Sequence, residues 1–258
     1  MPRARKPVND TVRIAMWSGP RNISTAMMRA WENRSDCAVI DEPFYAHYLA
    51  ETGLDHPARD AVIESGETSW RKVVETLTGP APGGKHVFYQ KHMAHHLLDH
   101  IDHDWIEGLH NILLIRDPVE VISSYTKARD EVTPEDIGLP QQVELFEELT
   151  EANGKPPMVI DAGDFLKAPE AYLRAICEHV GVPFMDCMLT WPSGPRDTDG
   201  VWAPHWYGQV QQSTGFHHPR PPGKRPELTG EAAETAEICR EYYDQLHAAR
   251  FVIPDASR

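Results

Sequence analysis

The chain has 258 residues, a net charge of −14 and 41% hydrophobic residues. This length allows a sizeable core in one domain, and no apolar stretch approaches the roughly 20 residues of a membrane helix. The acidic balance argues against nucleic acid as a partner, because that binding relies on many Lys and Arg contacts to phosphates. We therefore expect a single domain over residues 1–258, with neither a nucleic-acid nor a membrane partner.

The first residues and the cysteines indicate the compartment. Residues 1–6 are basic but lead into Asn9, Asp10 and a strand, not into an apolar secretory region. No Cys-x-x-Cys spacing joins any of the four cysteines, so reduced thiols are expected. Both features predict a cytoplasmic protein.

Five short apolar runs alternate with helical patterns along the chain. The runs cover residues 12–17, 37–40, 86–89, 111–115 and 157–160. Such alternation predicts an α/β fold, with a central parallel sheet flanked by helices on both faces. Ligands bind such sheets at the carboxyl ends of the strands. We expect four polar groups along that edge, namely Arg21, the pair Asp41–Glu42, the pair Lys91–His92, and Arg116.

The loop after the first run has the features of an anion site. Ser24 and Thr25 fall in the first turn of the next helix, where free backbone N–H groups and the helix dipole favour anions. Arg21 adds a forked positive charge. A plain strand-to-helix connection would show the same pattern, so that interpretation stays open. Because no Gly-Lys-Ser or Gly-Lys-Thr occurs, the magnesium-chelating pattern of P-loop NTPases is missing. The loop predicts a phosphorylated ligand bound without metal.

A second motif follows the fourth run. Asp117 is a good helix N-cap, Pro118 suits the first helical position, and Glu120 would complete a capping box. Arg116 therefore emerges at a strand end beside a helix start. Two turns into that helix, Ser124 is expected to bring its hydroxyl near the Arg116 guanidinium.

Three further segments have distinct patterns. Residues 53–84 carry Pro and Gly at both ends and predict a short helix over 69–77. Residues 191–226 are irregular and rich in Pro and aromatics, which fits either a lid over an acceptor pocket or packing over the sheet. The lid candidates there are His205, Trp206, Tyr207, Ser213, Thr214 and Phe216. Residues 231–250 predict a closing helix with the apolar stripe Ala236, Ile238, Tyr242 and Leu246.

The two motifs together resemble sulfotransferases that use 3′-phosphoadenosine 5′-phosphosulfate (PAPS). In that family a loop with Pro, a basic residue and Ser or Thr cradles the 5′-phosphosulfate, and a later Arg with a Ser eight residues on holds the 3′-phosphate. The likeness spans roughly residues 12–185 and implies a three-layer sandwich like that of P-loop NTPases. The cofactor-binding residues that it implies are Gly19, Pro20, Arg21, Asn22, Ile23, Ser24, Thr25, Arg116, Ser124, Lys224 and Arg225.

The sequence departs from the family pattern at three places. Ala26 stands where many cytosolic members have a Trp that stacks on adenine, so stacking is expected from Trp31 or the aromatic segment. Ile23 replaces the usual loop glycine. The basic contact near the C-terminus has a loose counterpart in Lys224 and Arg225.

The resemblance implies transfer of a sulfuryl group from PAPS to a hydroxyl or amine, with 3′-phosphoadenosine 5′-phosphate (PAP) as product and no metal. The acceptor is expected to be a small molecule or carbohydrate-like. Arg21, helped by Lys91, would stabilise the bridging oxygen as its bond to sulfur breaks. Two residues compete as the base. Glu42 resembles the strand-end Glu of tyrosylprotein and carbohydrate sulfotransferases, and His92 resembles the histidine of small-molecule sulfotransferases. Glu42 could equally be a salt-bridge partner.

Other interpretations remain at this stage. A kinase-like phosphotransferase would need a loop lysine that the sequence lacks, and a non-catalytic nucleotide-binding interaction module would bind PAP without turnover. The chain could also form a homodimer.

His96, His100 and His103 share one face of an expected helix. No cysteine or carboxylate clearly completes a metal site there, so partly exposed histidines are favoured over metal ligands.

Overall fold

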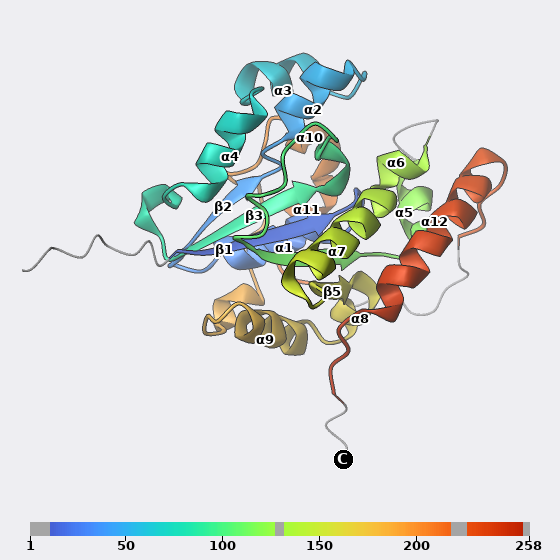
Figure 1. Cartoon of the computed structure of the whole chain (residues 1–258). Coiled ribbons are helices and arrows are strands. Elements are labelled where there is room, and N and C mark those ends of the chain that lie inside the picture. The colour runs from blue at the N-terminus through green and yellow to red at the C-terminus, as the bar shows by residue number, and fades with distance from the viewer. Residues whose placement is uncertain (1–10, 127–131, 218–225, 255–258) are drawn as a thin grey trace, which may run out of the picture.

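The structure is a computed structural model that describes residues 11–126, 132–217 and 226–254. Lys224 and Arg225 lie outside the described residues. Five strands form one parallel sheet in the order β2-β3-β1-β4-β5 (Figure 1). Their bounds are β1 Val12–Ser18, β2 Cys37–Asp41, β3 Val87–Met93, β4 His110–Ile115 and β5 Met158–Asp161.

Helices connect the strands and cover both faces. The longer ones are α1 (Ser24–Glu32), α2 (Tyr45–Thr52), α4 (Trp70–Thr78), α5 (Pro118–Tyr125), α7 (Leu139–Asn153), α9 (Pro169–His179) and α12 (Glu231–Ala248). Shorter ones are α3 (Arg59–Ser65), α6 (Pro134–Ile137), α8 (Ala162–Lys167), α10 (Ala203–Trp206) and α11 (Gly208–Gln212), with 3₁₀ turns η1 (Pro82–Gly84), η2 (Ala94–His96) and η3 (Asp186–Met188).

The central strand β1 separates two hydrophobic cores because its side chains alternate between the faces of the sheet. Ile14 and Met16 belong to a core shared with α1 and α9. Ala15 and Trp17 belong to a second core shared with α5, α7 and α12, and Figure 1 shows α7 and α12 side by side over that face. The predicted α/β architecture of three layers is thereby confirmed.

Strand β3 is longer than predicted, since it continues to Met93 and not only to residue 89. Lys91 and His92 therefore lie inside the strand and face opposite sides of the sheet. The extension has a physical reason. Lys91 lies opposite Asp41 in the register with β2, and its carbonyl oxygen accepts a hydrogen bond from the Glu42 N–H at 2.9 Å.

The predicted helix that would align three histidines is wrong. Only the single 3₁₀ turn Ala94–His96 forms there. His100 bonds to His47 through their Nε2 atoms at 3.0 Å, whereas His103 Nδ1 bonds to Glu148 Oε2 at 2.7 Å. Because His100 and His103 have such different partners, the three rings do not form one shared ligand face.

The C-terminal part also differs from its pattern. The predicted stripe of α12 is right for Ala236 and Leu246, but Ile238 is 51% exposed, because the buried face runs instead through Thr235, Cys239 and Tyr243. Beyond α12, Phe251 donates its N–H to the Val159 carbonyl at 2.8 Å, which covers the edge of β5. None of the helices in the described part combines the length and apolarity needed to cross a membrane.

Candidate functional site

The loop between β1 and α1 is held in a defined conformation. Asn22 anchors it, since its Nδ2 donates to the Leu114 carbonyl at 2.9 Å and its Oδ1 accepts the Ile23 N–H at 2.8 Å. Arg21 adopts a positive φ of 54°, which is uncommon for a residue with a side chain. At Gly19 a Cβ would lie 2.0 Å from the Ile137 carbonyl oxygen, so α6 can approach the loop only because residue 19 is glycine.

Helix α1 begins at Ser24, as predicted, and Thr25 lies in its first turn. Its N-cap residue Ile23 provides no side-chain hydrogen bond to the helix. The first N–H groups of a helix have no partner within it, and they attract anions together with the helix dipole. The loop residues Gly19 to Ile23 therefore lead into a helix end suited to an anionic group.

Two arginines meet beside this helix end. Arg21 donates from Nε to Ser124 Oγ at 3.0 Å, and Arg116 donates from Nη1 to the Arg21 carbonyl oxygen at 2.9 Å. Burial, together with the nearby charge of Arg116, lowers the pKa of the Arg21 guanidinium. We call Arg21, Arg116 and Ser124 the arginine clamp. It concentrates positive charge locally in an acidic protein, which favours an anion.

Two details of the second motif differ from the sequence prediction. Asp117 caps α5 as expected, with Oδ1 accepting the Val119 N–H at 2.9 Å, but the carboxylate of Glu120 pairs with Arg116 at 2.9 Å and does not form a capping box. The charge of Arg116 attracts this carboxylate one turn away. Ser124 bonds to Arg21 where a contact with Arg116 was expected, so the two motifs are linked more directly than predicted.

A second group of polar side chains surrounds Lys91. Its Nζ lies 2.8 Å from Asp41 Oδ1, 2.6 Å from Glu42 Oε1 and 2.8 Å from the Tyr207 hydroxyl. The Tyr207 hydroxyl donates to Asp41 Oδ2 at 2.6 Å and accepts from Trp202 Nε1 at 3.1 Å. We call Lys91, Asp41, Glu42 and Tyr207 the Lys91 cluster. The Lys91 side chain is only 1% exposed, so its positive charge must be balanced by these protein groups and not by water.

The cluster changes the acidity of its members. Burial, reinforced by the charge of Asp41, raises the pKa of the Glu42 carboxyl even though Lys91 opposes the shift. Burial disfavours the charge of Lys91, but the carboxylates of Asp41 and Glu42 outweigh it and raise the pKa of the lysine. Glu42 also has a positive φ of 43°, a conformation that the surrounding contacts must stabilise. A carboxyl with raised pKa at a strand end is suited to accept a proton.

His92 lies on the opposite side of the sheet from this cluster. Its ring stacks on Trp17 with 4.2 Å between centroids, and its Nε2 lies 3.2 Å from Gln90 Oε1. The residue is 1% exposed, and burial lowers its pKa to about 3. This geometry is that of a core histidine, and it favours Glu42 over His92 as the base.

The expectation that Trp31 stacks on adenine is wrong. Trp31 is fully buried and stacks on Tyr89, with 5.6 Å between centroids. Its place in the core follows from the apolar face of α1, which packs under the sheet. The ring therefore cannot reach a ligand at the carboxyl ends of the strands.

The aromatic segment divides into two parts. Trp206 accepts a hydrogen bond at its carbonyl oxygen from Arg21 Nη1 at 3.5 Å, and the next residue, Tyr207, belongs to the Lys91 cluster. These consecutive residues contact both groups of charged side chains. By contrast, Ser213 accepts from Trp191 Nε1 at 3.1 Å, and Phe216 packs on Phe165 and Trp191, which is packing over the sheet.

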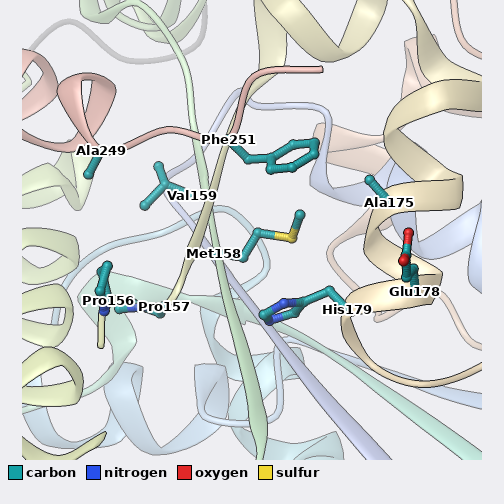
Figure 2. A pocket seen from close by; sticks show the side chains of 9 residues that line it. All are labelled: Pro156, Pro157, Met158, Val159, Ala175, Glu178, His179, Ala249 and Phe251. Carbon is teal, nitrogen blue, oxygen red and sulfur yellow. The ribbon is translucent and has the colours of Figure 1, made fainter. Parts of the chain in front are cut away.

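Two of the pockets formed by the described residues lie at different ends of the sheet. One, of about 350 Å³, opens beside Glu42 at the carboxyl end of β2. The other, of about 380 Å³, lies at the amino end of β5, between α9 and the segment that follows α12 (Figure 2). Its lining is mostly apolar, with Met158, Val159 and Phe251 close together. Of these two, the first adjoins the Lys91 cluster through Asp41 and Glu42, and no residue of the arginine clamp lines either.

One group of side chains in the described residues has metal-like spacing, formed by Asp161, Asp164 and His247. Protein groups already bond to its two acids. Asp161 accepts from the Tyr243 hydroxyl at 2.9 Å, and Asp164 pairs with Lys167 at 2.7 Å and with Arg250 at 2.9 Å. Ordinary hydrogen bonds and ion pairs account for this arrangement.

Comparison with known proteins assigns the family. The family model named Sulfotransferase domain matches residues 12–246. The chain belongs to the sulfotransferase family. This membership confirms the resemblance inferred from the two motifs, and it covers the arginine clamp, the Lys91 cluster and the pocket beside Glu42.

Solved sulfotransferase structures share the fold. The sulfotransferase domain of the olefin synthase of Synechococcus PCC 7002 has a TM-score of 0.53 and 18% identity, covering 91% of this chain and 97% of that one. A sulfotransferase from Alicyclobacillus acidocaldarius has a TM-score of 0.53 and 11% identity, covering 92% and 96%. At these identities the likeness shows the fold.

Curated relatives from Arabidopsis thaliana are closer in sequence. Branched-chain-amino-acid aminotransferase-like protein 1 is 38% identical over 207 residues, and protein 2 of the same name is 36% identical over 207 residues. The match covers 80% of this chain but only 37% and 36% of those proteins. The sulfotransferase-family chain thus spans little more than a third of the relatives' length.

Proposed function

We propose that this sulfotransferase-family protein transfers a sulfuryl group from PAPS to a hydroxyl or amine of a small acceptor. The observation that carries the proposal is the arginine clamp, in which Arg21 and Arg116 from two strand ends are joined beside the uncapped start of α1. A donor with phosphate groups at both ends of an adenosine needs two such cationic contacts.

The residues present fit that donor. Gly19 to Thr25 would hold the 5′-phosphosulfate through the loop, the Arg21 guanidinium and the first N–H groups of α1. Arg116 and Ser124 would hold the 3′-phosphate, and Lys224 with Arg225 would add charge from outside the described residues. Since the members of the clamp bond to one another, the groups for both phosphates lie next to each other.

We assign the base to Glu42. Its raised pKa and its place beside a pocket suit a group that takes the acceptor's proton as the new bond to sulfur forms. For Lys91 we propose a positioning role in place of the predicted help to Arg21 at the bridging oxygen. Because it is bound by Asp41, Glu42 and Tyr207, it positions the base, and Arg21 is left to stabilise the oxygen from which sulfur departs.

Two measurements test the proposal. Calorimetry should show PAP binding, and ATP with magnesium should bind at least about tenfold more weakly, because only PAP carries the 3′-phosphate that Arg116 and Ser124 would contact. Incubation with PAPS and a pool of alcohols and amines, read by mass spectrometry, should give products heavier by one sulfuryl group. Failure to bind PAP would refute the proposal. PAP binding with no product from any pool would instead identify a non-catalytic nucleotide-binding module.

The assignment of the base has its own control. Glu42→Gln should lower turnover by about 100-fold or more while PAP affinity stays unchanged, because only proton transfer is lost. His92→Phe should retain most of the turnover, since His92 lies in the core. A greater loss of turnover in the His92 variant, with PAP binding intact, would contradict the choice of Glu42.

A further inference from the structure

The pocket beside Glu42 has a defined size and wall. Its volume of about 350 Å³ is near the lower end for ligand sites, which suits a small molecule. The wall comes from the end of β2, from α2, α3 and α4, and from residues 199–202. Val62, Val73 and Trp202 give it an apolar side, so part of the occupant should be apolar.

The charged residues that line the pocket are all acidic. Among the described residues that line this pocket, four are acids, namely Asp41, Glu42, Glu67 and Asp199, and none is Lys, Arg or His. Lys91 lies beneath Asp41 and Glu42, and Arg29 pairs with Asp199 at 2.7 Å. With Lys72, which pairs with Glu67, three cations face these four acids, so the wall keeps an excess of one negative charge, which repels anions and attracts cations.

Glu67 is the acid with the most freedom to meet a ligand. Its side chain is 41% exposed at the pocket, and its Oε1 accepts the Ser69 N–H at 2.8 Å. That hydrogen bond lowers the pKa of the Glu67 carboxyl, so it stays charged at neutral pH. Its ion pair with Lys72 is long, at 3.5 Å, and both side chains face solvent, so a ligand can displace the lysine.

We propose that this pocket binds the acceptor and that the acceptor is a small cationic alcohol. Its hydroxyl would lie at Glu42, its apolar body against Val62 and Trp202, and its ammonium group toward Glu67. The inference rests on the proposed sulfuryl transfer and adds the substrate class. It also separates the charges of the two sites, because the donor meets the cationic clamp and the acceptor meets an acidic pocket.

The chemistry of the step decides which end of the acceptor reacts. The acceptor oxygen forms a bond to sulfur, and the bond from sulfur to the phosphate oxygen of the donor breaks with its electron pair going to PAP. The hydroxyl proton goes to Glu42. An ammonium nitrogen has no lone pair with which to attack sulfur. The cationic group must therefore stay at the far end while the hydroxyl reacts.

The test compares acceptors that share a hydroxyl group and a similar body but carry different charges at the remote end. Tyramine, 4-ethylphenol and 4-hydroxyphenylacetate share a phenol, and 5-aminopentan-1-ol, pentan-1-ol and 5-hydroxypentanoate share a primary alcohol. Calorimetry on PAP-saturated protein should show the amine of at least one series binding about tenfold or more tightly than its carboxylate, with the neutral alcohol between them. With PAPS, the same amine should give the highest kcat/KM.

The outcomes separate the two proposals. If the amine is not favoured in either series, or if no amine binds, the substrate class is wrong although sulfuryl transfer still stands. The PAP titration that precedes each experiment tests the donor site independently. If PAP itself does not bind, the proposed function fails before the acceptor question arises.

Matched variants on α4 test the place of binding. Thr76 and Thr78 are both exposed, and each hydroxyl bonds to the carbonyl four residues before it, but only Thr76 lines the pocket. Thr76→Trp should weaken binding of the preferred amine about tenfold or more by filling space, and Thr78→Trp should leave it unchanged. Equal effects of the two substitutions would overturn the assignment of the pocket.

Charge variants test the role of Glu67. Glu67→Gln removes the charge but keeps an oxygen for the Ser69 N–H, so it should reduce the preference for amine over carboxylate about fivefold or more. Glu64→Gln is the control, because Glu64 is exposed on α3 but does not line the pocket. An unchanged preference in the Glu67 variant would show that the cationic group binds elsewhere.

Discussion

Arg116 donates a hydrogen bond from Nη1 to the main-chain carbonyl oxygen of Arg21 at 2.9 Å. The side chain of one motif thus supports the backbone of the other, across the neighbouring strands β1 and β4. Ser124 completes the arrangement by accepting from the Arg21 guanidinium. Arg21 is therefore fixed at its backbone and at its side chain by the same strand-to-helix connection, which makes the clamp one unit.

The hydroxyl of Ser124 should matter for PAP affinity. Ser124→Ala removes the acceptor of Arg21 Nε, so the guanidinium loses its orientation and PAP should bind about tenfold more weakly by calorimetry. Ser123→Ala on the same helix is the matched control and should leave the affinity unchanged. A similar loss in both variants would mean that the helix, and not this hydrogen bond, holds the clamp.

Lys91 should matter for stability. Lys91→Met leaves the buried carboxylates of Asp41 and Glu42 without a cation, so the free energy of unfolding in urea should fall by about 3–5 kcal/mol. Adding Asp41→Asn removes one of the unpaired charges and should restore part of the loss. The exposed Lys72→Met should change stability by less than about 0.5 kcal/mol. No rescue in the double variant would contradict charge pairing as the cause.

Buried histidines should make the fold sensitive to acid. Burial lowers the pKa of His92 to about 3 and that of His95 to about 4, from an ordinary value of 6.5. Between pH 6.5 and those values the unfolded chain binds protons at these two histidines that the folded protein does not. The stability that their neutral forms contribute is therefore fully present above pH 6.5 and is lost as the pH drops. Each group contributes a slope of about 1.4 kcal/mol per pH unit.

Urea unfolding at pH 7, 6 and 5 measures this slope. His92→Phe keeps an aromatic ring against Trp17 and removes one titrating group, so stability of the variant should change less between pH 7 and pH 5. The comparison uses the change in stability of each protein between pH 7 and pH 5. The absolute values differ, because His92→Phe removes the hydrogen bond to Gln90 and lowers stability at every pH. A slope equal to that of the unaltered protein would contradict the role of His92.

Gly19 should tolerate no side chain. Gly19→Ala places a Cβ 2.0 Å from the Ile137 carbonyl oxygen, so the loop or α6 must move. The free energy of unfolding should fall by about 1–3 kcal/mol, and PAP should bind more weakly. Gly208→Ala is the control, since a Cβ there meets nothing within 4 Å, and thermal unfolding should be nearly unchanged. An unaltered melting temperature for the Gly19 variant would show that the loop and α6 accommodate a Cβ at little cost in stability.

Local signals in the sequence predicted much of the molecule. The apolar runs located all five strands, and the capping residue Asp117 and the polar residues after β1 located the starts of two helices. These features depend on residues close together in the chain, where propensity and periodicity act directly. For the same reason Arg21 and Arg116 could be assigned to one edge of the sheet.

Contacts between distant segments could not be read from the pattern. Tyr207 lies 166 residues from Asp41, and only the folded chain brings its hydroxyl to the Lys91 cluster. The extension of β3 depends on Lys91 meeting β2, and the burial of Trp31 depends on the sheet above α1. In each case tertiary packing decided the outcome, and the aromatic segment gave only a weak local signal for Tyr207.

Trp206 and Tyr207 are neighbours in the chain, yet one contacts Arg21 and the other contacts Asp41 and Lys91. Two adjacent residues therefore link the arginine clamp to the Lys91 cluster through one stretch of backbone. If a ligand at one of these sites changes the affinity for a ligand at the other, the second ligand changes the affinity for the first by the same factor. This dipeptide therefore joins the proposed donor site to the proposed acceptor site, and any coupling of affinity that passes through it is the same in both directions.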